Sequence, residues 1–224
     1  MISLVKQIPT LSLHRAEVVK INCNFNLYPE ISLFWVQDND KAVISMLDDN
    51  MVIYNNSANI EELREFIGVI SPASVFSDAD TLIRLFGQDF HRVNVMKCEH
   101  RFETDVKSHA VNSQEIYTLL NVNGLELPPY EYFAVDFCHK LNHGSLKYFA
   151  IKNLCAAVGI CDRHTALVNG IASHQKGMGS TALCGLLSQF DTPSLAVCKK
   201  DVVPFYLKNN FSLAYYAGYW RKNS

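Results

Sequence analysis

The segment Ser173–Leu183 combines residue types at a spacing that suits an anionic ligand. Gly177 and Gly179 are separated by one residue, so the backbone can turn tightly there and bring its N–H groups close to a ligand. We predict a helix from this turn onward, whose first N–H groups and positive dipole end would point at the same place. Positive charge and hydroxyl donors flank the glycines at Lys176, Ser180 and Thr181. Together these features predict a pyrophosphate-binding turn.

Other interpretations of the two glycines stay open at this point. A Gly-x-Gly at a strand–helix junction also occurs as a plain turn without a ligand. The segment is not a P-loop, because the spacing Gly-x-x-x-x-Gly-Lys-Ser/Thr is absent. A dinucleotide-binding fold is also disfavoured, because three consecutive predicted strands precede the turn instead of alternating strands and helices.

A second segment, Leu195–Phe211, predicts a strand, a short helix and the start of another strand. Asp201 is the expected N-cap of the helix, and Pro204 falls in its first turn, where a missing N–H costs little. Asn210 occupies the position at which a left-handed residue often ends a helix. This second segment favours a functional role for the glycine turn.

Residues 167–183 and 195–211 together resemble the GNAT acetyltransferase superfamily. Members of that family carry an Arg/Gln-x-x-Gly-x-Gly/Ala phosphate loop after their fourth strand. A strand, an Asn-containing loop and a helix that ends Phe-Tyr-x-Lys-x-Gly-Phe follow. In this chain the loop is His174–Gly179 and the helix end is Phe205–Phe211. The resemblance covers about residues 130–220, and its first helix is similar to that of bacterial members with a divergent N-terminal half.

Three positions depart from the family pattern. His174 stands in the Arg/Gln position, Asp201 replaces the loop Asn, and Asn210 replaces the Gly before the final Phe. An imidazole can still donate to a phosphate, so we expect weakened rather than lost binding. Asp and Asn keep their capping ability, so the other two changes are expected to be nearly neutral for the fold.

The resemblance implies an acetyl-CoA-dependent N-acetyltransferase, with acetyl-CoA as co-substrate and no metal. Backbone groups of Gly170, Ile171 and Ala172 would hold the acetyl-pantetheine arm, and N–H groups of residues 175–180 would hold the pyrophosphate. Besides Gly170, Ile171 and Ala172, the residues expected to bind the cofactor are His174, Gln175, Lys176, Gly177, Met178, Gly179, Ser180, Thr181 and Asp201. Tyr206 would protonate the departing CoA thiolate. The alternative for Tyr206 is a core tyrosine beside Phe205.

The base that deprotonates the acceptor amine is less evident. The predicted strand that precedes the glycine turn carries no carboxylate, although family members often place a Glu there. Candidates on the preceding helix are Asp136, His139 and His143, acting directly or through water. A surface or capping role is the alternative for each. Aliphatic amines have a pKa near 10.4, and solvent could also supply the deprotonation.

Composition limits the class of protein and its partners. With 49% hydrophobic and 19% charged residues there is ample material for a packed core. A net charge of -2 and a pI near 6.4 imply no broad attraction to nucleic acid or to a membrane surface. Seven cysteines without a CxxC pair argue against a disulfide framework or a structural zinc site. The absence of a signal peptide or a long apolar span predicts a cytoplasmic protein. The expected partner is a small-molecule or peptide amine, and the expected state is a monomer or homodimer.

Hydrophobic periodicity and turn residues predict the elements of both halves. Predicted strands are Ile31–Val36, Lys41–Leu47, Met51–Tyr54, Ala73–Phe76, His91–Val95, Leu146–Ile151, Leu154–Cys161, Thr165–Ser173, Ser194–Cys198 and Phe211–Trp220. Predicted helices are one capped by Asn59 in a capping box with Glu62, then Asp78–Phe86, Glu131–Asn142, one from Gly177-Met178-Gly179 to Phe190, and Val202–Asn209. Each half therefore follows the order strand, strand, strand, helix, strand, helix, strand.

The proline pair Pro128-Pro129 predicts a boundary between the two halves. We expect domains at residues 1–126 and 127–224, in an α+β (mixed α/β) fold with a GNAT-like twisted mixed sheet flanked by helices. The first half would be a degenerate repeat of the same unit. It has no glycine or basic residue between Tyr54 and Glu61, so it is expected to lack a cofactor site. It would then form a second wall of the acceptor cleft, or plain structural support.

Two further functions remain possible from the sequence. A non-catalytic acyl-CoA-binding module would explain the histidine in the phosphate loop and the missing base. A structural or interaction protein on a degenerate fold would bind no acetyl-CoA at all.

Overall fold

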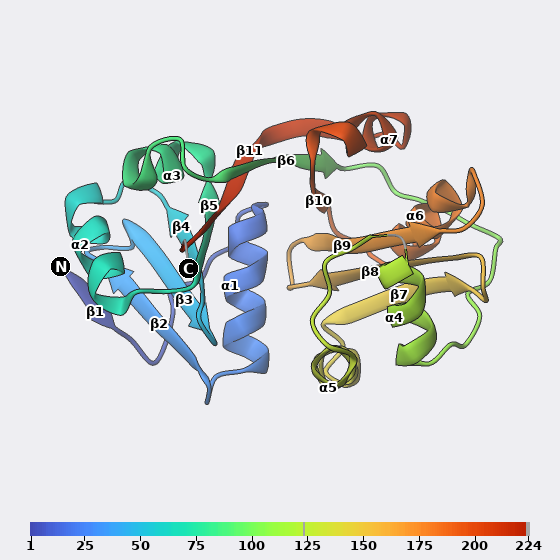
Figure 1. The fold of residues 1–224 in the computed structure, drawn as a ribbon, viewed down its shortest axis with the longest axis horizontal. Helices are drawn as coiled ribbons and strands as arrows, with labels where there is room; N and C mark the ends of the chain where they lie inside the picture. The colour runs from blue at the N-terminus through green and yellow to red at the C-terminus, as the bar shows by residue number, and fades with distance from the viewer. Residues whose placement is uncertain (123, 223–224) are drawn as a thin grey trace. The chain divides into compact units, whose positions relative to one another are not determined.

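The computed structural model describes residues 1–122 and 124–222, which form two compact units (Figure 1). The first unit comprises Met1–Met96, Cys198–Pro204 and the segment from Leu213 to the C-terminus. The second comprises Lys97–Val197 and Phe205–Ser212. The chain therefore passes between the units several times, and the end of the sequence returns to the unit in which it began.

The first unit is a mixed sheet with helices packed on it. Its elements are β1 (Ile2–Leu4), α1 (Ala16–Leu27), β2 (Ser32–Gln37), β3 (Ala42–Leu47), β4 (Asn50–Asn55), α2 (Ile60–Ile70), β5 (Ser74–Asp78), α3 (Ala79–Phe86), β6 (His91–Cys98), the 3-10 turn η1 (Lys200–Val202) and β11 (Ser212–Arg221). The strand order is β1-β2-β3-β4-β5-β11-β6. Strands β1 to β4 pair antiparallel, β4 and β5 pair parallel, and β11 pairs antiparallel with β5. α1 packs against β3, β4 and β5.

The core of the first unit lies between this sheet and α2 and α3. Ile44, Ile53 and Leu63 are fully buried in it. Trp220 from the last strand stacks on Phe86 of α3, with 4.4 Å between ring centroids. The C-terminal strand is therefore part of this core rather than an appendage to it.

The second unit is built in the same order. Its elements are α4 (Ser113–Val122), α5 (Tyr130–Asn142), β7 (Leu146–Ile151), β8 (Cys155–Cys161), β9 (Ala166–Ser173), α6 (Met178–Leu187), β10 (Ser194–Cys198) and α7 (Val203–Lys208). The strand order is β10-β9-β8-β7, with β7, β8 and β9 antiparallel and β10 parallel to β9. The expected repeat is therefore visible in the order of the elements, because β2-β3-β4-α2-β5-α3-β6 is followed by β7-β8-β9-α6-β10-α7-β11.

Helices α4 and α6 cover opposite faces of the sheet in the second unit. A Cβ on Gly159 of β8 would meet the Leu186 side chain of α6 at 3.3 Å. The partner of the neighbouring Val158 is Gly170, where a Cβ would meet the Leu120 side chain of α4 at 3.2 Å. Adjacent strand residues point to opposite faces, so the two helices lie on different sides of β8 and β9.

The structure divides the chain at a different place from the expected boundary at residues 126 and 127. Pro128 and Pro129 lie between α4 and α5, which pack against each other within the second unit, and the Tyr117 hydroxyl donates to the Pro128 carbonyl at 3.2 Å. The prolines therefore form the turn of a helical hairpin. The predicted 127–224 range also includes β11, which pairs with β5 of the first unit.

Most predicted elements are present, with shifts of a few residues at their ends. β1, α1 and α4 were not predicted from the sequence. α1 has Arg15 at its N-cap, whose side chain makes no capping bond, so it lacks the usual start signal. Asn59 caps α2 as predicted, by accepting from the Glu62 N–H at 3.3 Å. The capping box was wrong, because the Asn59 N–H donates to the Gln37 side chain at 2.7 Å instead of to Glu62.

Two helical glycines give a matched test of this packing. A Cβ on Gly185 of α6 would lie 2.2 Å from the Phe149 ring, whereas a Cβ on Gly68 of α2 would have nothing within 4 Å. We expect Gly185→Ala to cost about 1–3 kcal/mol of unfolding free energy through overpacking. Gly68→Ala should instead gain about 0.5–1 kcal/mol. Urea denaturation of both variants checks this, and equal stability of the two would contradict the packing of α6 on β7.

Candidate functional site

Strand β9 separates from β10 halfway along its length. Pairing between the two strands covers Ala166–Val168, whereas β9 continues to Ser173 in register with β8. Beyond Val168 the side of β9 that faced β10 is left with unpaired backbone groups, and these must find another partner. An extended ligand with amide groups is one such partner, because it can replace the missing strand.

A β-bulge lies at the same point. Val158 pairs with Gly170 and Gly159 pairs with Val168, so Asn169 is the extra residue of β9 and has no opposite residue on β8. Its side chain is exposed in an otherwise mostly buried strand. Asn169 was not among the residues predicted from the sequence. The signal was an Asn-Gly dipeptide inside an apolar strand, which is typical of a bulge.

The predicted acetyl-pantetheine residues lie directly after the bulge. Gly170 and Ala172 are buried and Ile171 is half-buried. A Cβ at Gly170 would come within 2.9 Å of the Leu125 side chain and 3.2 Å of Leu120, so glycine allows the α4 side of the unit to approach the strand closely. These residues pair with β8 on one side and lie beyond the pairing with β10 on the other, and their role in holding the acetyl-pantetheine arm stays a prediction.

The glycine turn that follows is open to solvent. His174, Gln175, Lys176 and Gly177 are exposed. Gly177 is the N-cap of α6 with φ +92°, a conformation that a residue with a side chain rarely adopts. A glycine has no side chain to cap the helix, so the first N–H groups of α6 point outward without that partner.

Local bonds already occupy some N–H groups of the turn. The His174 N–H donates to the Leu154 carbonyl at 2.8 Å, and those of Met178 and Ser180 donate to Gln175 and Gly177, both at 3.2 Å. The donors best placed for a phosphate are therefore the N–H groups of residues 175, 176, 177 and 179. The hydroxyls of Ser180 and Thr181 lie in the first turn of α6, where both residues are half-buried.

The matching helix of the first unit has the opposite character. The Asn59 side chain caps α2, and Glu61 and Glu62 lie in its first turn. Carboxylates there interact favourably with the helix dipole and repel an anion. In each repeat a helix follows the third strand, α2 in the first and α6 in the second. Only the start of α6 is suited to binding a phosphate.

Tyr206 is buried, with 6% of its surface exposed. Its ring centroid lies 5.2 Å from those of Phe205 and Phe211, in edge-to-face contacts. A Cβ added to Gly179 would lie 3.4 Å from the Phe205 ring, so Phe205 packs beside the first turn of α6. Asn210 has φ +64° and ends α7 as predicted. The role of Tyr206 as the acid stays a prediction, and its aromatic packing fits the core alternative as well.

The predicted base candidates are not gathered around the glycine turn. Asp136 forms an ion pair with Lys140 at 2.7 Å, and His143 at the end of α5 lies 2.8 Å from the His139 carbonyl through its Nδ1. His143 precedes β7 at the end of the sheet where β9 begins, since the Ser145 carbonyl bonds to Cys161 and Cys161 pairs with Ala166. The length of β9, about 23 Å at 3.3 Å per residue, separates that end from the turn.

Asp201 does not cap a helix as expected. It lies inside η1, whose N-cap is Lys199, and it belongs to the first unit. Within that unit the carboxylate contributes, after burial, to raising the pKa of the Cys198 thiol to about 11. Asp201 thus belongs to the first unit and the turn at His174–Thr181 to the second, and a role for Asp201 at the cofactor stays a prediction.

Burial also raises the pKa of Cys184, the thiol on α6, so it stays protonated at neutral pH.

No group of three or more His, Cys, Asp and Glu side chains able to hold a metal occurs within residues 1–122 and 124–222. Among the same residues no helix combines the length and apolar character needed to cross a bilayer.

The uncapped start of α6 leads to a prediction with two readouts. We expect Ser180→Asp to stabilise the protein by about 0.3–1 kcal/mol, because the new carboxylate lies at the positive end of the helix. The same change should weaken the binding of inorganic pyrophosphate, measured by calorimetry. Ser188→Asp, at the other end of α6, is the control, and it should not stabilise the protein or alter pyrophosphate binding. Unchanged binding in Ser180→Asp would show that the anion does not use this helix.

No protein-family model matches the chain, and no curated protein sequence matches it either. Solved structures do match. An acetyltransferase of the GNAT family from Colwellia psychrerythraea is similar with a TM-score of 0.56 and 11% identity, over 99% of this chain and 100% of that one. A tandem GNAT protein from the clavulanic acid biosynthesis pathway has a TM-score of 0.55 and 10% identity, over 93% and 89%. N-myristoyltransferase of Saccharomyces cerevisiae has a TM-score of 0.50 and 8% identity, over 88% and 70%. The chain therefore has a GNAT-like fold that extends through both of its halves.

Proposed function

We propose that the second unit is an acetyl-CoA-dependent N-acetyltransferase that acts on a primary amine of a small molecule or peptide. The observation that carries the proposal is that a strand edge without a neighbouring strand runs directly into an exposed turn at the start of a helix. The unpaired length of β9, residues 169–173, leads directly into the exposed glycine turn and the uncapped start of α6. An amide-containing arm that ends in a pyrophosphate matches this sequence of groups.

In the proposed complex the two ends of acetyl-CoA are bound by different kinds of interaction. The pantetheine amides would pair with backbone groups of β9, as an added strand does. The pyrophosphate would accept hydrogen bonds from the N–H groups of residues 175, 176, 177 and 179, with the dipole of α6 and the charge of Lys176 adding attraction. The exposure of Lys176 keeps its ammonium hydrated, so its contribution is screened by salt.

The acetyl group would then lie near the bulge at Asn169. The amine nitrogen attacks the thioester carbon, and the carbonyl oxygen becomes an oxyanion that a backbone N–H of β9 can stabilise. Collapse of this intermediate breaks the C–S bond and expels the CoA thiolate. A proton must reach the sulfur and another must leave the amine, and Tyr206 is the proposed donor to sulfur.

Removal of the amine proton is assigned to water rather than to a single side chain. Asp136 and His143 lie beside β7 and toward the far end of the sheet, and β9 carries no carboxylate. A free amine has a pKa near 10.4, so only a small neutral fraction is present at pH 7. We expect the rate to rise with pH through the neutral range as that fraction increases.

Binding and turnover can be tested separately. Calorimetry with CoA tests the donor site, and release of free thiol from acetyl-CoA over a panel of amines tests the chemistry. An N-acetyltransferase should bind CoA and release thiol from acetyl-CoA when an amine is present. A non-catalytic acyl-CoA-binding module should bind CoA without releasing thiol. Binding without turnover on any amine indicates an acyl-CoA-binding module, and no heat with CoA contradicts the proposal.

Tyr206→Phe tests the proposed acid. The variant keeps the ring that packs on Phe205 and Phe211, so it should still fold and bind CoA, and its stability is measured alongside its activity. Loss of a general acid should lower kcat by about 10²–10⁴-fold. Phe205→Leu is the control for packing, since it disturbs the same cluster without removing a hydroxyl. A Tyr206→Phe protein as active as the wild type would exclude the assigned role.

A further inference from the structure

The first unit contains a second splayed pair of strands, which corresponds in order to β9 and β10. Pairing between β4 and β5 covers Asn50–Val52, and beyond Val52 the two strands separate. Side chains of the chain itself fill the gap that follows. The Ser77 hydroxyl donates to the Ile53 carbonyl at 2.8 Å, and the Asn55 amide donates to the Thr81 hydroxyl at 2.8 Å. The splayed end of the first unit is therefore closed.

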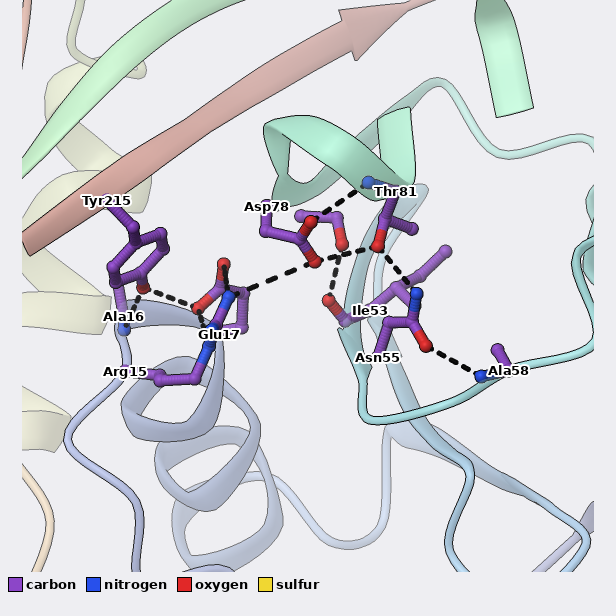
Figure 2. A network of polar contacts seen from close by, with 10 residues as sticks. Arg15, Ala16, Glu17, Ile53, Asn55, Ala58, Asp78, Thr81 and Tyr215 are labelled. Atoms are coloured by element: carbon purple, nitrogen blue, oxygen red, sulfur yellow. Dashed lines mark hydrogen bonds and ion pairs between the residues drawn. The ribbon is translucent and has the colours of Figure 1, made fainter. Parts of the chain in front are cut away.

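A cation lies beside this closure, where Arg15 contacts Glu17 and Asp78 (Figure 2). The Arg15 guanidinium contacts Glu17, with 3.5 Å between Nε and Oε2, and Asp78, with 3.9 Å between Nη2 and Oδ2. Its Cζ also lies 4.3 Å from the ring centroid of Tyr215 and 6.0 Å from that of Tyr54. Two carboxylates and two aromatic rings thus surround one guanidinium, and we call these four residues the acidic-aromatic cage.

The cage is built from four different elements of the first unit. Glu17 is in the first turn of α1, Tyr54 is in β4, Asp78 ends β5 and caps α3, and Tyr215 is in β11. The Tyr215 hydroxyl donates to Glu17 at 2.6 Å and accepts from the Ala16 N–H at 2.9 Å. Asp78 accepts from both the N–H and the hydroxyl of Thr81. Three of the four cage side chains, Glu17, Asp78 and Tyr215, are therefore held in place by partners other than Arg15.

Electrostatics explains why this cage requires a cation. Glu17 is fully buried, and burial raises the pKa of its carboxyl group, which Arg15 and Tyr215 partly offset. A buried carboxylate is costly unless it is paired. Arg15 supplies the pairing, and its Nε is buried without a well-aligned hydrogen bond. Arg15 Nη2 donates one long hydrogen bond to Glu17 Oε1, at 3.5 Å, so charge and ring stacking accompany a single directed bond.

We propose that the acidic-aromatic cage is a guanidinium-binding site which the chain's own Arg15 occupies as a tethered ligand. A planar guanidinium can stack on Tyr215 while it faces two carboxylates, which a compact ammonium does less well. The two repeats then use the same splayed strand end for opposite charges. In the proposed complex the second presents N–H groups to an anion, whereas the first holds a cation of its own. This inference stands independently of the acetyl transfer.

Chemical rescue tests the proposal. Arg15→Ala empties the cage, so its Tm should fall by several degrees. Millimolar methylguanidinium should then raise the Tm of Arg15→Ala, because a ligand that binds the folded state stabilises it. Methylammonium at the same concentration should do so less. The wild type, whose cage is filled, and the double variant Arg15→Ala with Glu17→Gln, whose cage has lost its buried charge, should show no such shift.

A second measurement covers the case in which Arg15→Ala does not fold. In the wild type the Arg15 Nε–H should give a side-chain NMR signal that exchanges slowly with water, because that nitrogen is buried. The signal should be absent from Arg15→Lys. A fast-exchanging Arg15 signal, or an equal effect of methylguanidinium on the wild type and on Arg15→Ala, would overturn the proposal.

Discussion

The separation of β9 from β10 at Val168 is the constraint on which the rest of the candidate site depends. A strand that loses its partner exposes a row of N–H and C=O groups, and these must bond to water, to side chains or to a ligand. The bulge at Asn169 falls at the same residue and turns the strand where the pairing stops. The glycine turn and α6 then continue from the open strand. Each feature alone is common in proteins. Here the open strand, the glycine turn and the helix start follow one another within a dozen residues, so an extended ligand could bind along all three.

The two repeats have the same order of elements but carry different groups at their splayed strands and at the helix that follows. In each, a third strand leads through a loop into a helix, and a parallel strand follows. In the first repeat the helix begins with a capping Asn59 and two glutamates, and Arg15 lies between Glu17 and Asp78 at the splayed strands. In the second repeat a glycine with positive φ begins the helix. The difference arises from a few residues at the strand ends and not from the order of the elements.

The local structure was largely predictable from the sequence. β7 and β10 have the predicted bounds, and the cap at Asn59 and the left-handed Asn210 are as expected, because each rests on near neighbours in the chain. The repeat order followed from the same local signals. The start of α1 at Arg15 gave no capping signal and was missed. Pairing between distant segments was not visible either, so the return of β11 to β5 and the helical-hairpin role of Pro128-Pro129 were not anticipated.

The candidate site was predictable in part for the same reason. The glycine turn is a contiguous motif, and the structure leaves it exposed at the start of a helix. Asp201 was expected to cap a helix, whereas it lies inside a 3-10 turn of the first unit, and its expected role at the cofactor stays a prediction. The cage around Arg15 joins residues 15, 17, 54, 78 and 215, and no spacing rule brings such distant positions together.

The central claim is that an anion binds where β9 passes through the glycine turn into α6. Backbone amide shifts recorded by NMR during a titration with CoA test it most directly, because the amides of the two repeats are observed in one experiment. The account predicts the largest shifts at residues 175–179, with smaller ones along residues 169–173 and none at the start of α2. Shifts at residues 60–63, or the absence of any shift at the glycine turn, would contradict it.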